Sequence, residues 1–495
     1  MLGAALVERK KSWLFSLDAK KDIIMAVFKN RGIMLDPARL LEKRSYYDGL
    51  LPWLKEWGYN ILHFHFTDDQ GCAVRLPSHP ELAKDNAYSP EEMRAFIARA
   101  KKLGITVIPE LESLGHTQFI TKHPKYAHLG GAQGKSSCFN SLHPKKKEAR
   151  AVIKDLLADI AAIFPSEIIH AGLDEVDMSA IPEFSKLSRA DQWKAFAPHS
   201  NWVHEEIRKL GRRPAMWGDH LLHSPQLADA TGKDVLIFDW HYDAPFSPHT
   251  IRFFLDRKFE VWGCPASMQW NQKVLPSASN QLQNLREFAA HGAILQKKGC
   301  TGMINTVWCP WRYLSGVMDL PMALGGHVFS QAAESPTFLR DFAADFYGMA
   351  KSDAQTVGEL IWQMHAIAPQ RSNYGRLMLG ELDSIPFSRE DARWFGAMEK
   401  SAITLEKALK PLLKKAKRNA DRLNDYVLTA RILQAFGRFG AANRKRGSVG
   451  NIDALLKACD ASWCRTKDEP WQSIAIPSTG TEWLLPTLKT LPKLG

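Results

Sequence analysis

The sequence lacks features that mark whole classes of protein. Its 495 residues contain no run of about 18 apolar residues, so no membrane-spanning segment is expected. No Gly-x-Gly-x-x-Gly follows the first strand pattern, so a doubly wound dinucleotide-binding sheet is not indicated. No RNA-recognition or zinc-finger motif occurs, so no nucleic-acid partner is expected. With 45% hydrophobic and 24% charged residues, the composition is that of a globular protein.

Cysteine is scarce and follows no pattern. The seven cysteines include no Cys-x-x-Cys pair and no disulfide-framework spacing. We interpret them as free thiols of a reducing compartment, and a zinc site built on them is not expected. Residues 8–11, Glu-Arg-Lys-Lys, stand where a signal peptide would have its apolar core. The sequence therefore predicts a cytoplasmic location.

Positive charge is concentrated in one segment. Residues 400–446 carry 13 Lys and Arg against three acids, which is +10 of the net charge of +12. The segment has a helical pattern, and Pro411 inside it predicts a kink or a break. We interpret it as a solvated basic helix face. The alternative is contact with an anionic partner, such as RNA, an acidic glycan or a neighbouring subunit.

Short apolar runs alternate with helical patterns between Arg31 and Ala333. Eight strand–helix units over about 300 residues predict an α/β fold, a (β/α)8 TIM barrel over residues 30–334 that follows an N-terminal extension at 1–29. Helical patterns then continue without strands, so we expect a helical domain over 335–465 and an extended tail over 466–495. The expected strands are Gly32–Leu35, Asn60–Phe66, Ile105–Glu110, Ile168–Gly172, Ala215–Trp217, Val235–Phe238, Glu260–Gly263 and Met303–Val307.

Acidic and aromatic residues collect just after these strands, where a TIM barrel carries its site. Carboxylates that accept hydroxyl protons and flat rings that cover an apolar face suit a sugar. The strand at Ile168 ends in a glycine and then exposes the adjacent acids Asp174 and Glu175. Since two close carboxylates do not ionise independently, one pKa should rise and leave a proton donor. A helix N-cap by Asp174 is the structural alternative.

Four segments resemble motifs of family 20 glycoside hydrolases, the β-N-acetylhexosaminidases. Residues 31–39 (RGIMLDPAR) are similar to the family's R-G-x-x-L-D-x-x-R, and residues 63–70 (HFHFTDDQ) to its H-x-H-x-x-D-D-Q. Residues 108–117 (IPELESLGHT) resemble its P-E-x-D-x-P-G-H-S/T, and residues 170–176 (HAGLDEV) its H-x-G-G-D-E-V. The four stand in the family's order at expected strand ends.

The resemblance implies exo-acting, retaining release of terminal β-linked GlcNAc or GalNAc from a glycan, without metal or cofactor. Glu175 would protonate the glycosidic oxygen, and the substrate's own acetamido oxygen would attack to give an oxazolinium intermediate. Asp174 would orient the acetamido N–H and stabilise the positive charge. The resemblance also implies substrate-binding or supporting roles for Arg31, Asp68, His116, Trp217, Trp240 and Trp308.

The chain departs from the family pattern at several points. Leu173 stands where the family has Gly, and Glu112 where it has Asp. The family's acetamido-binding Tyr after the seventh strand is absent, and Tyr242 after the sixth is our candidate replacement. The outer-hydroxyl Glu of the family's W-x-E is also absent after Trp308, while Arg312 nearby leaves an anionic sugar open.

Two other functions stay open at this stage. A metal-dependent amidohydrolase would use His63 and His65, two residues apart on one strand, together with His116, His170 and an Asp. A non-catalytic or altered-specificity glycan-binding barrel would explain the missing Tyr and Glu. A preference between GlcNAc and GalNAc does not follow from the sequence, and a homodimer is left open.

Overall fold

The computed structural model describes residues 28–130, 142–176, 181, 183–184, 186–188, 191, 193–269, 272–368, 387–443, 448–471 and 484–491. Apart from Phe28 and Lys29, the expected N-terminal extension at 1–29 therefore lies outside the described residues. Within the described part, no helix combines the length and the apolar character needed to cross a membrane.

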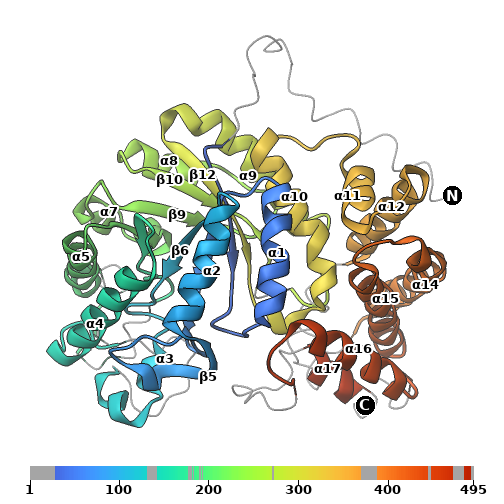
Figure 1. Cartoon of the computed structure of the whole chain (residues 1–495), viewed down its shortest axis with the longest axis horizontal. Helices are drawn as coiled ribbons and strands as arrows, with labels where there is room; N and C mark the ends of the chain where they lie inside the picture. Colours follow the sequence, from blue (N-terminus) through green and yellow to red (C-terminus); the bar gives the residue numbers. More distant parts are fainter. Residues whose placement is uncertain are drawn as a thin grey trace.

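Eight parallel strands form a closed barrel, as the sequence predicts (Figure 1). Pairing of β1 with β12 closes it, with Asn30 opposite Gly302 and Leu35 opposite Val307. Two of the strands, β2 and β10, are buried along their whole length, as expected for a sheet covered on its outer face. In order around the barrel the strands are β1 (Asn30–Leu35), β2 (Ile61–His65), β6 (Thr106–Glu110), β7 (Ile168–His170), β8 (Arg213–Trp217), β9 (Leu236–Trp240), β10 (Val261–Cys264) and β12 (Cys300–Val307).

Amphipathic helices cover the outside of the barrel. In α2, Met93, Phe96, Ile97 and Ala100 form the buried face, and the expected capping box at Ser89 and Glu92 starts the helix. A small sheet of β3 (Thr67–Asp68), β4 (Gly71–Val74) and β5 (Ala83–Tyr88) extends from the end of β2, and β11 (Ala266–Met268) pairs with the end of β12. The covering helices include α1 (Arg44–Glu56), α2 (Pro90–Lys102), α4 (Lys147–Ile163), α5 (Trp193–Lys209), α7 (Pro225–Ala230), α8 (His249–Asp256), α9 (Gln281–Leu295) and α10 (Asp319–Gln331).

The C-terminal region is helical and lies beside the barrel on the α1 and α10 side (Figure 1). It contains α11 (Phe338–Tyr347), α12 (Lys351–Ile367), α14 (Arg389–Leu409), α15 (Ala420–Ala441) and α16 (Asp453–Thr466). Within the tail expected to be extended, Leu484–Thr490 form α17 instead, because Leu484, Leu485 and Leu488 are buried along one face. Pro411 lies in the 3-10 turn Lys410–Lys415 that follows α14, so it marks the end of that helix.

Buried polar contacts hold the helical region on the barrel. Asp319 at the start of α10 accepts from Arg422 of α15 at 2.7 Å, and Glu42 pairs with the buried Lys467 at 2.5 Å. The described part of the basic segment, residues 400–443, lies in the α14–α15 hairpin and the turn after it. Its acid Glu406 pairs with Arg431 of α15. This acid is therefore paired within the hairpin. Lysines remain on the exposed surface of α14 and the following turn.

Candidate active site

A cavity of about 600 Å³ opens at the carboxyl ends of the barrel strands. This volume lies within the range of small-ligand pockets. Seven residues that the sequence named line it: Asp68, His116, Asp174, Glu175, Trp240, Tyr242 and Trp308. The remaining lining includes Arg39, Asp69, Gln70, His241, Asp243, Phe246, His249 and Gln269.

The loop after β7 carries the two adjacent acids. Asp174 is buried, with 9% of its surface exposed, whereas the side chain of Glu175 is 44% exposed. His116 lies between the two, with its Nε2 3.3 Å from Glu175 Oε2 and 3.7 Å from Asp174 Oδ2. Gly115 allows this approach, because a Cβ there would lie 2.5 Å from the carbonyl oxygen of Asp174. The expected acidic pair therefore faces the cavity together with a histidine.

The two acids titrate differently. Burial raises the pKa of Asp174 to about 7, and the nearby negative charges of Asp219 and Glu175 add to this, while His116 opposes it. Burial also raises the pKa of Glu175, but hydrogen bonding to His116 and its charge outweigh burial and leave that pKa below its usual value. One pKa rises, as the sequence predicts, and in the empty cavity the raised one belongs to Asp174 rather than to the expected proton donor.

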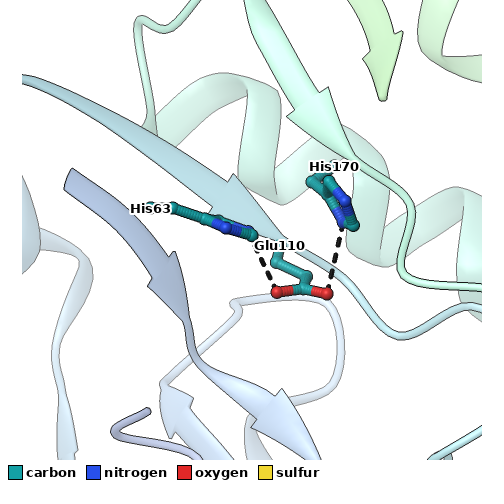
Figure 2. Close-up of side chains that lie close together, drawn as sticks. All are labelled: His63, Glu110 and His170. Atoms are coloured by element: carbon teal, nitrogen blue, oxygen red, sulfur yellow. Dashed lines mark ion pairs between the residues drawn. The ribbon is translucent and has the colours of Figure 1, made fainter. Parts of the chain in front are cut away.

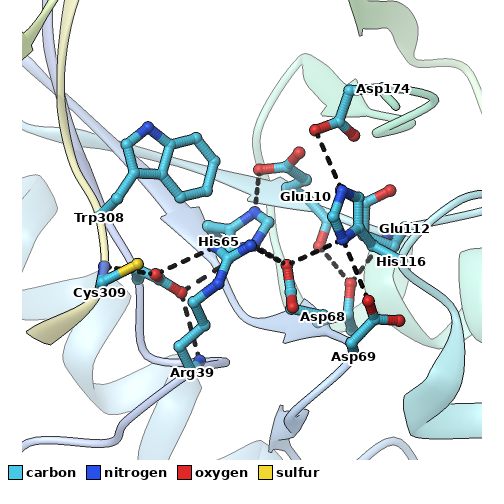
Figure 3. A network of polar contacts seen from close by, with 12 residues as sticks. Arg39, His65, Asp68, Asp69, Glu110, Glu112, His116, Asp174, Trp308 and Cys309 are labelled. Carbon is cyan, nitrogen blue, oxygen red and sulfur yellow. Dashed lines mark hydrogen bonds and ion pairs between the residues drawn. The ribbon is translucent and has the colours of Figure 1, made fainter. Parts of the chain in front are cut away.

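A network of buried ion pairs includes Arg39, Asp68 and His116, which line the cavity (Figure 3). Arg39 Nη1 lies 3.1 Å from Asp36 Oδ2, and Arg39 Nη2 lies 2.8 Å from Asp68 Oδ2. Burial works against the charged form of Asp68, but Arg39, followed by His116 and His65, lowers the pKa of this carboxyl well below its ordinary value. Asp68 is also 3.8 Å from His116 Nδ1, so the network reaches the histidine that contacts Glu175.

Glu110, at the end of β6, binds three histidines (Figures 2 and 3). Its Oε2 is 2.6 Å from His65 Nδ1 and 2.9 Å from His63 Nε2, and its Oε1 is 3.2 Å from His170 Nδ1. Although burial opposes it, Glu110 and the other acids raise the pKa of His65 to about 10, so this ring is an imidazolium. Three of the four histidines that the amidohydrolase alternative needs, His63, His65 and His170, thus lie within 3.2 Å of one carboxylate.

Donor atoms close enough together to hold a metal ion occur in four groups among the described residues. Two of them share Glu110, whose Oε1 also accepts the indole N–H of Trp217 at 2.6 Å, while His170 Nδ1 accepts the Gly172 amide at 3.1 Å. The four groups are His63, Glu110 and His170; His65, Glu110 and Glu112; Asp68, Asp69 and His116; and His116, Asp174 and Glu175.

Three aromatic rings form part of the cavity lining: Trp240, Tyr242 and Trp308. Tyr242 stacks on Trp240 with ring centroids 5.0 Å apart, and its hydroxyl oxygen accepts the indole N–H of Trp308 at 3.0 Å. Burial raises the pKa of Tyr242 well above its ordinary value, so the hydroxyl keeps its proton. Trp217 does not line the cavity: it is fully buried and lies beneath Trp308, 6.0 Å between centroids. Its role is to support the wall.

The expectation for Arg31 is corrected by its position. Arg31 is the second residue of β1, and its guanidinium donates to the carbonyl oxygens of Gly58, at 2.7 Å, and Phe28. It therefore lies at the opposite end of the strand from the cavity. Arg39, the second arginine of the same motif, lines the cavity instead. Arg312 is fully buried and does not line the cavity, so it gives no support for an anionic sugar.

Sequence reasoning missed several lining residues. Arg39 could have been found from its place three residues after Asp36, beyond the end of β1. His241, Asp243 and Phe246 come from the connection between β9 and α8, and His249 is the first residue of α8; the sequence gives no pattern that places them. Gln269, which follows β11, donates to Asp243 at 2.9 Å and so helps to fix this connection.

The sequence profile described as "Glycosyl hydrolase family 20, catalytic domain" matches residues 28–267. Residues 28–267, which include seven of the eight barrel strands, thus match the catalytic domain of this family. The barrel is also 28% identical over 248 residues to a beta-hexosaminidase of Vibrio furnissii, covering 43% of this chain and 40% of that protein. It is 30% identical over 166 residues to a beta-N-acetylhexosaminidase of Cellulomonas fimi, covering 30% of this chain and 33% of that protein. The chain thus spans two fifths or less of the length of these two curated relatives.

Solved structures show the same fold. An inactive mutant of an exo beta-N-acetylglucosaminidase from Vibrio harveyi gives a TM-score of 0.51 at 21% identity, covering 68% of this chain and 59% of that one. A chitobiase of Flavobacterium johnsoniae gives a TM-score of 0.52 at 16% identity. The match covers 94% of this chain and 78% of the chitobiase chain. At these identities the likeness supports the barrel architecture and no finer property.

Proposed function

We propose that this chain is an exo-acting, retaining β-N-acetylhexosaminidase that removes terminal β-linked GlcNAc or GalNAc by substrate-assisted catalysis. The observation that carries the proposal is the pair Asp174 and Glu175, which faces Trp240, Tyr242 and Trp308 across one cavity of sugar size. The family match of residues 28–267 and the names of the relatives agree with this activity.

The bound sugar is held from two sides. Arg39 presents a rigid fork of N–H donors at the cavity floor, which suits the hydroxyls of a terminal sugar. Asp174 accepts the acetamido N–H, and the retained proton of the Tyr242 hydroxyl is donated to the acetamido oxygen. Trp240 and Trp308 cover the apolar faces of the acetamido group and the ring.

Binding moves the proton of the acidic pair. Between the lowered pKa of Glu175 and about pH 7, Asp174 and Glu175 together hold one proton, which sits on Asp174 in the empty cavity. A substrate N–H hydrogen-bonded to Asp174 favours its charged form, and covering Glu175 by the leaving group removes it from water. Both effects shift the proton to Glu175, where it can reach the glycosidic oxygen.

The reaction then proceeds in two steps. Glu175 gives its proton to the leaving oxygen while the acetamido oxygen forms a bond to the anomeric carbon, and the glycosidic C–O bond breaks. Asp174 stabilises the positive charge of the resulting oxazolinium ion. Glu175 next takes a proton from water, whose oxygen opens the ring at the anomeric carbon and restores the original configuration.

A panel of para-nitrophenyl β-glycosides tests the proposal. The parent should release nitrophenol from the GlcNAc or GalNAc glycoside and not from the glucoside that lacks the acetamido group. The Glu175→Gln variant should lose at least about 100-fold in kcat on the same substrate, as removal of a general acid does. Absence of turnover on both acetamido sugars, or full activity of Glu175→Gln, would refute the assignment.

We also propose a cytoplasmic location for the chain. Six described cysteines are free thiols, and five of them are buried. Free thiols are typical of a reducing compartment. Fractionation of the source cells, with the hexosaminidase assay on each fraction, tests this.

A further inference from the structure

The loop that carries the acidic pair has a strained backbone. Gly172, Leu173 and Glu175 all have positive φ angles, of 64°, 74° and 45°. Glycine adopts this left-handed region freely, but Leu and Glu do so only at a cost in free energy. Such conformations persist where the surrounding structure fixes them. The described structure must therefore contain contacts that hold residues 173–176 in place.

Two side chains from the short helix that follows β8 supply such contacts. Asp219 Oδ2 accepts the backbone N–H of Glu175 at 3.0 Å, and His220 Nε2 accepts the next N–H, that of Val176, at 2.8 Å. Both acceptors begin α6 (Asp219–His223), directly after β8. The ring of His220 packs on Phe196 of α5 at 4.8 Å between centroids, which fixes its orientation.

We propose that Asp219 and His220 are positioning residues for the general acid. By accepting two successive amide protons they hold Glu175 in the left-handed conformation that directs its carboxyl into the cavity, within reach of His116. The catalytic part of this inference rests on the proposed function, because Glu175 is the acid only in that mechanism. Leu173, in place of the family's glycine, adds to the strain that the two acceptors must oppose.

The charge of Asp219 also affects the pKa of Asp174, and this effect can be tested separately from the hydrogen bond. Its carboxylate raises the pKa of Asp174, which also faces His116, Glu175 and Glu110. The pKa of the buried Glu112 is in turn raised by Asp174, so this acid belongs to the same group. An asparagine at 219 keeps an oxygen that can accept the amide and removes the charge. An alanine removes both.

Three variants of the full chain test the proposal: Asp219→Ala, Asp219→Asn and His220→Phe, with Asp229→Ala as control. Asp229 lies on the next helix, α7, where its side chain forms an exposed ion pair with Arg257. On para-nitrophenyl N-acetyl-β-hexosaminide, Asp219→Ala and His220→Phe should lose about 30-fold in kcat, equivalent to about 2 kcal/mol, with KM within about threefold. The control should match the parent.

The asparagine variant supplies a readout that a merely structural role would not move. Asp219→Asn should keep kcat within about fivefold of the parent at its optimum. The alkaline limb of its kcat/KM profile should move to lower pH, because Asp174 loses a negative neighbour. If Asp219→Asn loses as much as Asp219→Ala, or if its alkaline limb stays in place, the assignment is overturned.

Hydrogen exchange tests the contact independently of activity. The amides of Glu175 and Val176 should exchange at least about tenfold faster in Asp219→Ala and His220→Phe, respectively, than in the parent. Unchanged exchange would overturn the positioning role whatever the kinetics. Faster exchange in a chain whose parent hydrolyses neither acetamido sugar would instead refute the proposed function and leave the contact standing.

Discussion

Replacing Arg39 by Met should cost both activity and stability, whereas replacing Arg31 by Met should cost stability alone. Arg39 lines the cavity and is 9% exposed, and the two carboxylates that it binds, at 2.8 and 3.1 Å, are almost fully buried. Arg31 binds backbone carbonyls at the far end of the same strand. The two variants thus compare the arginine that the structure favours with the one that the sequence motif suggested.

The magnitude follows from burial. Removing one partner of a buried ion pair typically costs about 3–5 kcal/mol, because a charge is left without compensation. Arg39→Met removes this partner from Asp68 and Asp36, but His65 Nε2 still lies 3.1 Å from Asp68 Oδ2, so we expect a loss at the lower end of this range. For activity, each hydrogen bond from a charged donor to the sugar contributes about 1.5–3 kcal/mol, so two such bonds predict a loss of at least about 100-fold in kcat/KM.

The assay combines urea unfolding with steady-state kinetics on the preferred para-nitrophenyl substrate. Arg31→Met should unfold at lower urea but keep kcat/KM within about twofold of the parent. Arg39→Lys, which keeps the charge and loses the fork, should fall between the parent and Arg39→Met. The reasoning is refuted if Arg39→Met keeps its kcat/KM, or if Arg31→Met loses as much activity as Arg39→Met.

Three further outcomes are expected. The kcat/KM profile should fall above about pH 7, where the acidic pair loses its shared proton, and in Asp174→Asn this limb should move to more acidic pH; a limb unchanged by the substitution would contradict the assignment. Tyr242→Phe should lose about 10- to 100-fold in kcat/KM with the ring stack on Trp240 kept, and parent-like kinetics would exclude the hydroxyl as a donor. Burial lowers the pKa of His365 to about 4, so folding disfavours its protonation. The contribution to stability is therefore complete above pH 6.5 and is lost as the pH falls toward 4, by up to about 3 kcal/mol. In calorimetric or urea unfolding, His365→Phe should lose less stability over this pH range than the parent.

The sequence was a good guide to the strands and to the residues just beyond them. Apolar runs ending in acids located Asp68, Asp174 and Glu175, because parallel strands of a barrel bring their carboxyl ends together. The sequence was a poor guide to which residue of a motif reaches the cavity. Arg31 and Asp36 are five residues apart on an extended strand, which at about 3.3 Å per residue separates them by about 16 Å.

Properties set by tertiary burial were beyond sequence reasoning. Which acid of the pair has the higher pKa depends on exposure, and Asp174 is far more buried than Glu175. The support role of Trp217 depends on its complete burial beneath Trp308. In the tail, Pro and Thr obscured a short helix whose leucines are buried. In each case the neighbours that decide the outcome come from distant parts of the chain.

Attack by the substrate's own amide is the central claim, and a series of N-acyl substrates tests it most directly. Measuring kcat/KM for the N-acetyl, N-fluoroacetyl, N-difluoroacetyl and N-trifluoroacetyl para-nitrophenyl glucosaminides varies the nucleophilicity of the carbonyl oxygen with little change in shape. If that oxygen attacks the anomeric carbon, kcat/KM should fall steeply with each added fluorine. A flat series would mean that another group performs the attack and would contradict the account.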